Sequence, residues 1–260
     1  MSEIVSAKQD CGRWYQSMPR KILLLAAAFC LAMVGPLVAG PFSVTLPPDA
    51  GGNSIRVEGF SFDDRTLSFL VVDEGSLTAP RHGGLDPAMR QAGAIAGING
   101  GFFSPEGAPL GRMVADGVVT GRLARGSLTS GVIFRDDRGL FLWRVAEYEA
   151  KGSPVARQML QAGPFLIDAR AKVPGLEATK SRPRSFVAHD GKHAWVIATA
   201  GSCTLAGLSE ALSRAGTLDG VGLVRALNLD GGSSTGLWMQ GKVMRRPWAK
   251  VRNYLAVVPK

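Results

Sequence analysis

The chain has 260 residues, of which 46% are hydrophobic and 20% charged, and its formal net charge is +9. This apolar share suffices for a packed core, which excludes a wholly disordered chain. The 33 glycines and 15 prolines follow no G-X-Y period, which excludes collagen, and their number favours short strands and turns over a helix bundle.

An export signal is predicted at the N-terminus. Arg20 and Lys21 precede the uncharged run ILLLAAAFCLAMVGPLVAG at 22–40, and a basic flank before an apolar run is typical of secretory signals. The run is also just long enough to cross a bilayer. Residues 1–40 are therefore either a signal peptide, cleaved after Gly40, or a retained N-terminal anchor.

Three further expectations concern this segment. The residues before Met18 are long and polar for a signal, so we expect translation to begin at Met18 rather than Met1. We expect the protein to be exported to the periplasm or beyond, and to meet a membrane only through residues 22–40 if these are retained. Cleavage would leave Cys203 as the single thiol, so no internal disulfide is expected.

The first half of the chain reads as a lead-in followed by short strands and one helix. Residues 41–54 are rich in Pro and Gly and show no periodicity. An alternating, β-rich run at 65–74 predicts a strand after a turn at Asp63-Asp64. Residues 85–91 predict a short helix, with Asp86 as its cap. The apolar run 94–98 predicts a buried strand.

The second half adds a hairpin, a helix and more strands. Residues 185–199 predict a hairpin, because Asp190-Gly191 separates two apolar arms. A helix is predicted from the cap Thr204 to Gly216. Further strands are expected at 112–120, 131–134, 140–145, 163–168, 223–229, 236–244 and 253–258. No linker divides 55–260, so we expect a single α+β domain with a large mixed β-sheet and a few helices.

Two glycine-rich turns follow apolar strands: Asn99-Gly100-Gly101-Phe102-Phe103 and Asp230-Gly231-Gly232-Ser233-Ser234. Loops at strand ends hold polar groups on a rigid support, and paired glycines bring backbone N–H groups near a bound molecule. Asn-Gly and Asp-Gly are also common in hairpin turns, which is the structural alternative. A third segment, Arg182-Pro183-Arg184-Ser185, offers guanidinium groups suited to phosphate.

Together with Ala162-Gly163-Pro164 and the Thr204–Leu208 helix start, these motifs occur in the order found in the phosphodiester glycosidase family. The resemblance runs from about Ala94 to Tyr254. The sequence departs from the family pattern in two places: Ser233 replaces a frequent third glycine, and Ser185 replaces the usual threonine after the arginine. The first change bears on how closely the backbone approaches a substrate.

The resemblance implies hydrolysis of the bond between the anomeric carbon and the phosphate oxygen of a sugar-1-phosphodiester. It implies that Asp230 activates water or stabilises the oxocarbenium-like centre, that Arg184 clamps the phosphate, and that Asn99 assists catalysis. The implied substrate-binding residues are Gly100, Gly101, Phe102, Phe103, Ser185, Gly231, Gly232, Ser233 and Ser234. No second catalytic carboxylate is identified.

Other functions compete with this interpretation. A non-catalytic binding module for phosphosugars or exopolysaccharide would keep the arginine and aromatic surfaces without needing Asp230. Residues 232–236 match the G-x-S-x-G of serine hydrolases, but a strand-like run follows and the last histidine is His193. His189 and His193 flank a hairpin turn, where two ligands rarely converge on a metal, and we expect both to be exposed.

Partners and cofactors follow from charge and chemistry. The basic residues are scattered rather than clustered, so no nucleic acid is expected. An anionic sugar-phosphodiester or envelope polysaccharide is the expected partner. No cofactor is required by the motifs, although Asp230 among polar groups is also compatible with Ca²⁺ or Mg²⁺, so metal dependence stays open.

Overall fold

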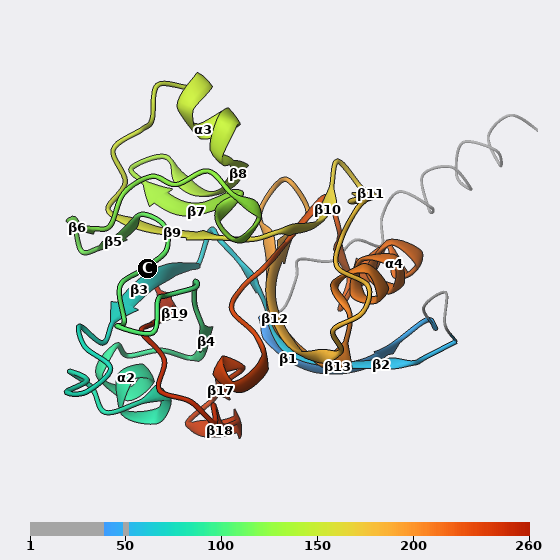
Figure 1. Ribbon diagram of the computed structural model, residues 1–260, viewed down its shortest axis with the longest axis horizontal. Helices are drawn as coiled ribbons and strands as arrows, with labels where there is room; N and C mark the ends of the chain where they lie inside the picture. Colours follow the sequence, from blue (N-terminus) through green and yellow to red (C-terminus); the bar gives the residue numbers. More distant parts are fainter. Residues whose placement is uncertain (1–38, 49–51) are drawn as a thin grey trace, which may run out of the picture. The chain divides into compact units, whose positions relative to one another are not determined.

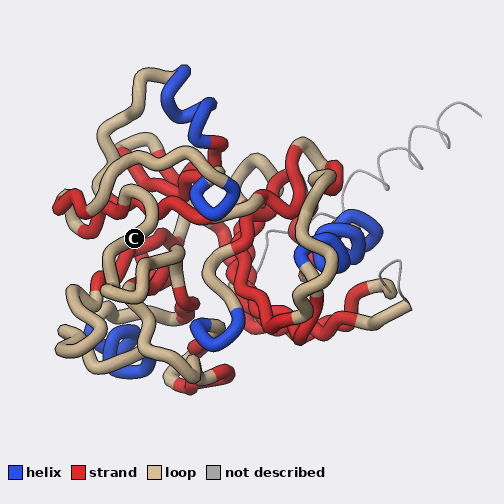
Figure 2. The backbone as a smooth tube through the Cα atoms, viewed as in Figure 1, coloured by secondary structure: helices blue, strands red, loops and turns tan. Residues whose placement is uncertain are grey.

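The computed structural model describes residues 39–48 and 52–260 (Figure 1). The predicted signal or anchor lies outside the described residues, apart from Ala39 and Gly40. None of the described helices has the length and apolar character required to cross a membrane. The described residues are mostly β-structure, with a few short helices between the strands (Figure 2).

The strands form three large sheets rather than the one large mixed sheet expected. All pairings recorded among the described strands are antiparallel, and this corrects the expectation of mixed pairing. Seven of the fifteen pairs join consecutive strands, and short connections of this kind produce antiparallel pairs.

The seven-stranded sheet has the order β1 (Gly40–Leu46), β2 (Ile55–Asp63), β13 (Ala194–Cys203), β12 (Arg182–His189), β16 (Arg225–Asn228), β10 (Phe165–Asp168) and β11 (Ala171–Lys172). One five-stranded sheet has the order β18 (Lys242–Arg245), β17 (Leu237–Met239), β4 (Ala96–Asn99), β19 (Asn253–Pro259) and β3 (Leu67–Asp73). The other has β6 (Val118–Thr120), β5 (Met113–Ala115), β9 (Gln158–Ala162), β7 (Gly131–Asp136) and β8 (Gly139–Arg144).

One central core joins the three sheets. Its buried side chains come from all of them, including Trp195, Ile98 and Ile133. Each sheet also packs its opposite face against a helix: α4 (Leu205–Ala215) on the seven-stranded sheet, α2 (Leu85–Gln91) on the sheet with β4, and α3 (Val145–Ala150) on the third (Figure 1). Both faces of every sheet are therefore covered over much of their area, which accounts for the apolar strands.

Several predicted elements are confirmed. The hairpin of β12 and β13 turns at 190–193. Thr204 caps the start of α4, where its side chain accepts a hydrogen bond from Gly207 N, and the left-handed Gly216 caps its end. The run 94–98 corresponds to β4, and α2 has the predicted bounds. Asp86, however, does not cap α2; it lies in the first turn and accepts hydrogen bonds from Arg90 and Trp238.

Other boundaries were predicted incorrectly. Residues 41–54 contain most of β1, which pairs with β2 along its length, so the domain begins before Ile55. The runs 112–120 and 236–244 each form two strands, because Asp116-Gly117 and Gln240-Gly241 adopt positive φ and turn the chain. The helix α3 and strand β9 were missed, along with the small pair β14 (Thr217–Leu218) and β15 (Val221–Gly222).

Candidate active site

The two glycine-rich turns lie side by side where β4 and β16 end. Asp230 N donates to Gly100 O at 3.0 Å, and Asn99 Nδ2 donates to Asp230 O at 2.7 Å. Because β4 belongs to a five-stranded sheet and β16 to the seven-stranded sheet, these bonds join two sheets at the ends of interior strands. The loops at 99–101 and 230–236 thus form one junction.

The start of β12 completes this junction. Leu229 N donates to Ser185 O at 2.8 Å, and the Ser185 hydroxyl donates to Asn99 Oδ1 at 2.6 Å. A Cβ placed on Gly231 would lie 2.9 Å from the Pro183 carbonyl oxygen, so the backbones of the two loops are in contact. Three segments far apart in the sequence therefore meet as the motifs led us to expect.

Asn99 holds the junction together and is fully buried. Its Oδ1 accepts hydrogen bonds from Ser185 Oγ and, at 3.0 Å, from Gly236 N, while its Nδ2 donates to Asp230 O. The amide oxygen therefore accepts two hydrogen bonds, and one of the two amide N–H groups donates one, all within the protein. The side chain of Asn99 therefore positions the loops, and does not itself face solvent as a catalytic group would.

Asp230 is the carboxylate of the junction. Its Oδ1 accepts from Gly231 N at 2.8 Å. Burial is the main influence on its ionisation and raises the pKa of the carboxyl, while hydrogen bonds from Ser234 and Gly231 act in the opposite direction. A partly buried carboxyl with a raised pKa is suited to general acid–base chemistry.

The glycines after Asn99 have a different role from the one predicted. Gly100 N and Gly101 N donate to Asn253 O and Oδ1, at 2.9 Å and 2.7 Å, so these amides do not face a bound molecule. Neither glycine has positive φ. A Cβ would lie 2.0 Å from Asn253 Oδ1 at Gly100 and 2.5 Å from the Gln161 carbonyl oxygen at Gly101, so close packing explains both.

Asn253 itself was missed by sequence reasoning. It is fully buried at the start of β19, beside Asn99 on the neighbouring strand. The available signal was that a polar residue, Asn253, begins the apolar run NYLAVV. The sequence pattern does not indicate which groups this side chain contacts.

Arg184 does not fit the phosphate clamp predicted for it. Its Nε donates to Cys203 O at 3.1 Å and its Nη2 to Lys180 O at 2.6 Å, and the side chain is 10% exposed. Desolvation lowers the pKa of the guanidinium. Two of its nitrogens donate to backbone carbonyls, Glu177 lies 3.7 Å away and the side chain is mostly buried, so the guanidinium is held within the protein rather than presented to a phosphate.

Arg182 is the accessible arginine of this segment. It is exposed, and its Cδ would lie 3.7 Å from a Cβ placed on Gly232. Among the described residues the Arg182 side chain makes no hydrogen bond or ion pair. After desolvation, its positive charge is a further reason for the lowered pKa of Arg184. The free cation beside the aspartate loop is therefore Arg182.

The remaining predicted residues lie around the junction. Ser185 and Ser234 are buried, Ser233 is exposed, and Gly231, Phe102 and Phe103 are intermediate. The 3-10 turn η3 (Gly232–Ser234) leads into β17 without an intervening helix, so residues 232–236 lack the strand–turn–helix geometry of a serine-hydrolase elbow.

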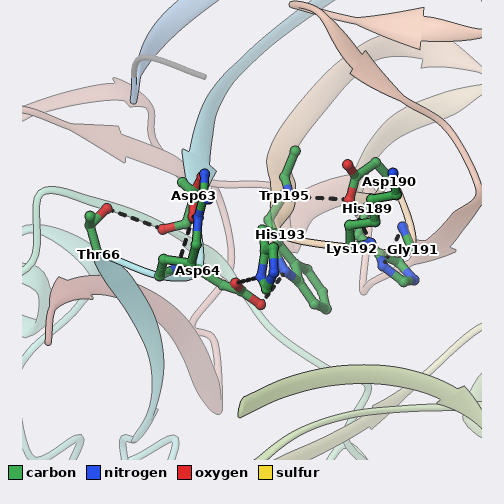
Figure 3. A network of polar contacts seen from close by, with 11 residues as sticks. Asp63, Asp64, Thr66, His189, Asp190, Gly191, Lys192, His193 and Trp195 are labelled. Carbon is green, nitrogen blue, oxygen red and sulfur yellow. Dashed lines mark hydrogen bonds and ion pairs between the residues drawn. The ribbon is translucent and has the colours of Figure 1, made fainter. Parts of the chain in front are cut away.

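The two hairpin histidines lie at the turn of the β12–β13 hairpin (Figure 3), at the opposite end of β12 from Arg182. Of the two, only His193 is exposed. His193 Nδ1 donates to Asp64 Oδ1 at 2.7 Å. His189 stacks on Trp195, with ring centroids 4.7 Å apart, and its Nε2 is buried. The expectation that both are exposed is wrong for His189. Among the described residues, no group of three His, Cys, Asp or Glu side chains is placed to hold a metal.

The junction therefore brings a partly buried aspartate with a raised pKa, a buried asparagine and an exposed arginine together at the ends of antiparallel strands. Comparison with protein families shows which family the chain belongs to. The family model for phosphodiester glycosidase matches residues 92–258, more than half of the chain. The chain belongs to the phosphodiester glycosidase family, as the resemblance implied.

Solved structures share the fold. The catalytic domain of zebrafish N-acetylglucosamine-1-phosphodiester alpha-N-acetylglucosaminidase, auto-inhibited by its pro-peptide, superposes with a TM-score of 0.62 at 16% identity, covering 88% of this chain and 85% of that one. A Synechocystis protein gives 0.58 at 18% identity, covering 88% of this chain and 65% of its own. A Burkholderia pseudomallei protein gives 0.54 at 14% identity, covering 80% and 75%. No curated protein matches the sequence.

Proposed function

We propose that the protein is an exported hydrolase that cleaves the glycosidic bond of a sugar-1-phosphodiester. The observation that carries this proposal is the junction itself, where Asp230, with a raised pKa, lies against the loops of Asn99 and Arg182. Membership of the family supports the same chemistry. The substrate is an anionic sugar-phosphodiester or envelope polysaccharide, in keeping with the net charge of +9.

The leaving group of this reaction needs little help from a general acid. A phosphate monoester is a weak base, so its departure with the bridging oxygen needs charge stabilisation more than a strong acid. In our proposal Asp230 takes a proton from the attacking water or stabilises the developing positive charge at the anomeric carbon. Arg182 replaces Arg184 as the cation that faces the phosphate, and Phe102 and Phe103 offer half-buried rings to a sugar.

Three of the predicted residues act through others. Asn99 and Ser185 fix the loop that carries Asp230, and Gly231 allows that loop to touch Pro183 O. Preorganisation of this kind lowers the reorganisation needed during reaction. These residues are positioning residues in our account.

The test is a screen of the mature protein, residues 41–260, against 1-phosphodiesters of several sugars, followed by Asp230→Asn. We expect release of free sugar by the wild type and a loss of turnover of at least about 100-fold in the variant, with substrate binding retained. If both proteins bind a sugar phosphodiester and neither cleaves it, the chain is a binding module and the enzymatic proposal fails.

A further inference from the structure

An edge strand presents cations and apolar side chains together to solvent. β18 lies at the edge of its five-stranded sheet, beyond β17 (Figure 1). Its side chains alternate as in any strand: Lys242 and Met244 are exposed, and Val243 between them packs against the hydrophobic cluster that contains α2. We call the exposed side chains along this segment the β18 surface: Lys242, Met244, Arg246, Trp248 and Lys250.

The two apolar members of the β18 surface are Met244 and Trp248. Met244 is 49% exposed and Trp248 is 94% exposed, although tryptophan is highly buried on average in folded proteins. Single apolar residues scattered over a surface need no explanation. Here two large ones lie four positions apart along one segment, so they form a local apolar ridge.

The backbone that carries Trp248 is fixed. Trp248 N and Ala249 N both donate to Ser233 O, at 2.8 Å and 3.1 Å. The ring of Pro247, the preceding residue, packs closely on the backbone of Gly236, because a Cβ placed on that glycine would lie 2.5 Å from Pro247 Cγ. The indole therefore projects into solvent from a loop that is held in place on the protein side.

The charged residues of the segment 242–250 are all basic: Lys242, Arg245, Arg246 and Lys250. Three of them, Lys242, Arg246 and Lys250, are exposed. Within the described part of the chain, the side chains of these three make no recorded hydrogen bond or salt bridge. Their charges are therefore available to a partner.

The acidic residue of the neighbouring helix is already paired. α2 contacts β18, and Asp86 in its first turn pairs with Arg90 at 3.0 Å and accepts a hydrogen bond from the Trp238 indole at 2.7 Å. The hydrogen bond from Arg90, followed by that from Trp238, lowers the pKa of Asp86, and the charge of Arg246 is the last of the causes. The β18 surface therefore keeps a net positive charge, which suits an anionic partner.

A bilayer with anionic headgroups matches both the charge and the apolar ridge. Tryptophan is enriched at the boundary between headgroups and acyl chains, where its ring is buried and its N–H stays hydrated. Lysine and arginine attract anionic lipids while their apolar stems lie along the boundary. An anionic polysaccharide would engage the cations but would leave Met244 in water. A second copy paired along this edge would bring like charges together.

We propose that the β18 surface docks the protein on an anionic lipid bilayer, with the indole of Trp248 inserted at the level of the headgroups and Arg246 and Lys250 against the lipid phosphates. This contact goes beyond the expectation that only residues 22–40 meet a membrane, and it does not rest on the proposed hydrolysis. Because Ser233 O binds the Trp248 loop, docking would hold the aspartate loop close to the bilayer.

The first experiment measures sedimentation with vesicles. It uses the mature chain, residues 41–260, which lacks the apolar run 22–40 and contains all of the core described above. Vesicles of phosphatidylcholine, with and without phosphatidylglycerol, are mixed with the wild type, Trp248→Ala and Arg246→Gln/Lys250→Gln. We expect the wild type to bind the anionic vesicles in a salt-sensitive manner, and both variants to bind at least about tenfold more weakly.

The matched control, Arg122→Gln/Lys192→Gln, removes the same amount of charge elsewhere. Arg122 follows β6 and Lys192 lies in the β12–β13 turn, and both are exposed. We expect this control to bind the anionic vesicles as the wild type does. An equal loss of binding in the control would overturn the proposal, because net charge rather than the β18 surface would then account for binding.

The second experiment locates the indole, using vesicles with brominated acyl chains, which quench tryptophan fluorescence at short range. The other tryptophans of the mature chain are buried, except for the half-buried Trp143. We expect quenching of the bound wild type, and none of Trp248→Ala at lipid concentrations high enough to bind it. Binding without quenching would overturn the insertion of Trp248 and with it the proposal.

A third arm distinguishes the other class of anionic partner. Binding of the wild type to dextran sulfate, a soluble anionic polysaccharide, with no binding to either kind of vesicle, would assign the β18 surface to a polysaccharide and overturn the proposal. None of these readouts uses turnover, so their failure would leave the proposed hydrolysis standing, and a failure of the hydrolysis would leave the docking surface standing.

Discussion

The carboxyl of Asp230 is the residue on which the chemistry depends. Burial raises the pKa of this carboxyl above its ordinary value. A general base works only when ionised, so we expect kcat/KM to fall as pH is lowered through that raised pKa. The measurement is a pH profile of kcat/KM on a sugar-1-phosphodiester. A profile that stays flat down to the ordinary range of an aspartate would contradict the assigned role.

Arg182 and Arg184 are two residues apart but have different surroundings. Arg182 is exposed beside Gly232, whereas Arg184 donates to two backbone carbonyls. We expect Arg182→Ala to raise KM about tenfold with little change in thermal stability. We expect Arg184→Ala to lower the free energy of unfolding by about 1–3 kcal/mol, because it leaves buried carbonyls without donors.

The two variants serve as controls for each other when kinetics and thermal unfolding are measured together. If Arg184→Ala keeps wild-type stability and loses only phosphate-bearing substrates, the sequence-based assignment of the clamp was right and ours is wrong.

At the scale of elements, the site depends on the close approach of β12 and the aspartate loop. The backbone of Gly231 is extended, with φ −134° and ψ −162°, a conformation that alanine also adopts. An alanine at this position would therefore be disfavoured by a steric clash and not by its backbone conformation. The added Cβ would lie 2.9 Å from the Pro183 carbonyl oxygen, which belongs to the backbone and cannot rotate away.

We therefore expect Gly231→Ala to push Asp230 out of position. Activity should fall at least about tenfold, with a loss of roughly 1–3 kcal/mol in stability. Gly201→Ala in β13 is the matched control, because its Cβ would have only one neighbour, Arg56 O, at 3.8 Å. Thermal unfolding and kcat/KM of both variants decide the matter, and wild-type activity in Gly231→Ala would show that the contact is unimportant.

At the scale of the whole molecule, three sheets depend on one core, and the β12–β13 hairpin carries a histidine into it. His189 stacks on Trp195, and its Nδ1 accepts from Gly191 N at 3.0 Å, so the ring proton lies on the buried Nε2 (Figure 3). Desolvation, followed by the charge of Arg225, lowers the pKa of His189 to about 4.

This lowered pKa predicts acid sensitivity. Between the ordinary histidine value of 6.5 and about 4, the unfolded chain binds a proton that the folded protein does not, so stability is lost as pH falls through this window. His189→Phe should unfold with a shallower dependence on pH between these values, as measured by denaturant titrations. The matched control is His82→Gln, at a half-buried histidine on the segment between β3 and α2.

Local chemistry predicted local structure well. Thr204 and Gly216 delimit α4, and Asp190-Gly191 marks the hairpin, because caps and turns depend on a few neighbouring residues. The division into three sheets was not predictable, because the apolar runs do not specify which strand each one pairs with.

The same limit applied to the site. The motifs located its three loops, but the roles of Arg184 and of Gly100 depend on partners distant in sequence, Cys203 and Asn253. Such contacts leave no periodic signal in the chain.

Hydrolysis in ¹⁸O-labelled water tests the central claim most directly, because the claim concerns which bond of a sugar-1-phosphodiester is broken. If water attacks the anomeric carbon beside Asp230, the label enters the sugar and the phosphate monoester leaves with its own oxygen. We predict ¹⁸O in the released sugar and none in the phosphate. Label found in the phosphate would contradict the account, because it would mean that the phosphorus–oxygen bond is cleaved instead.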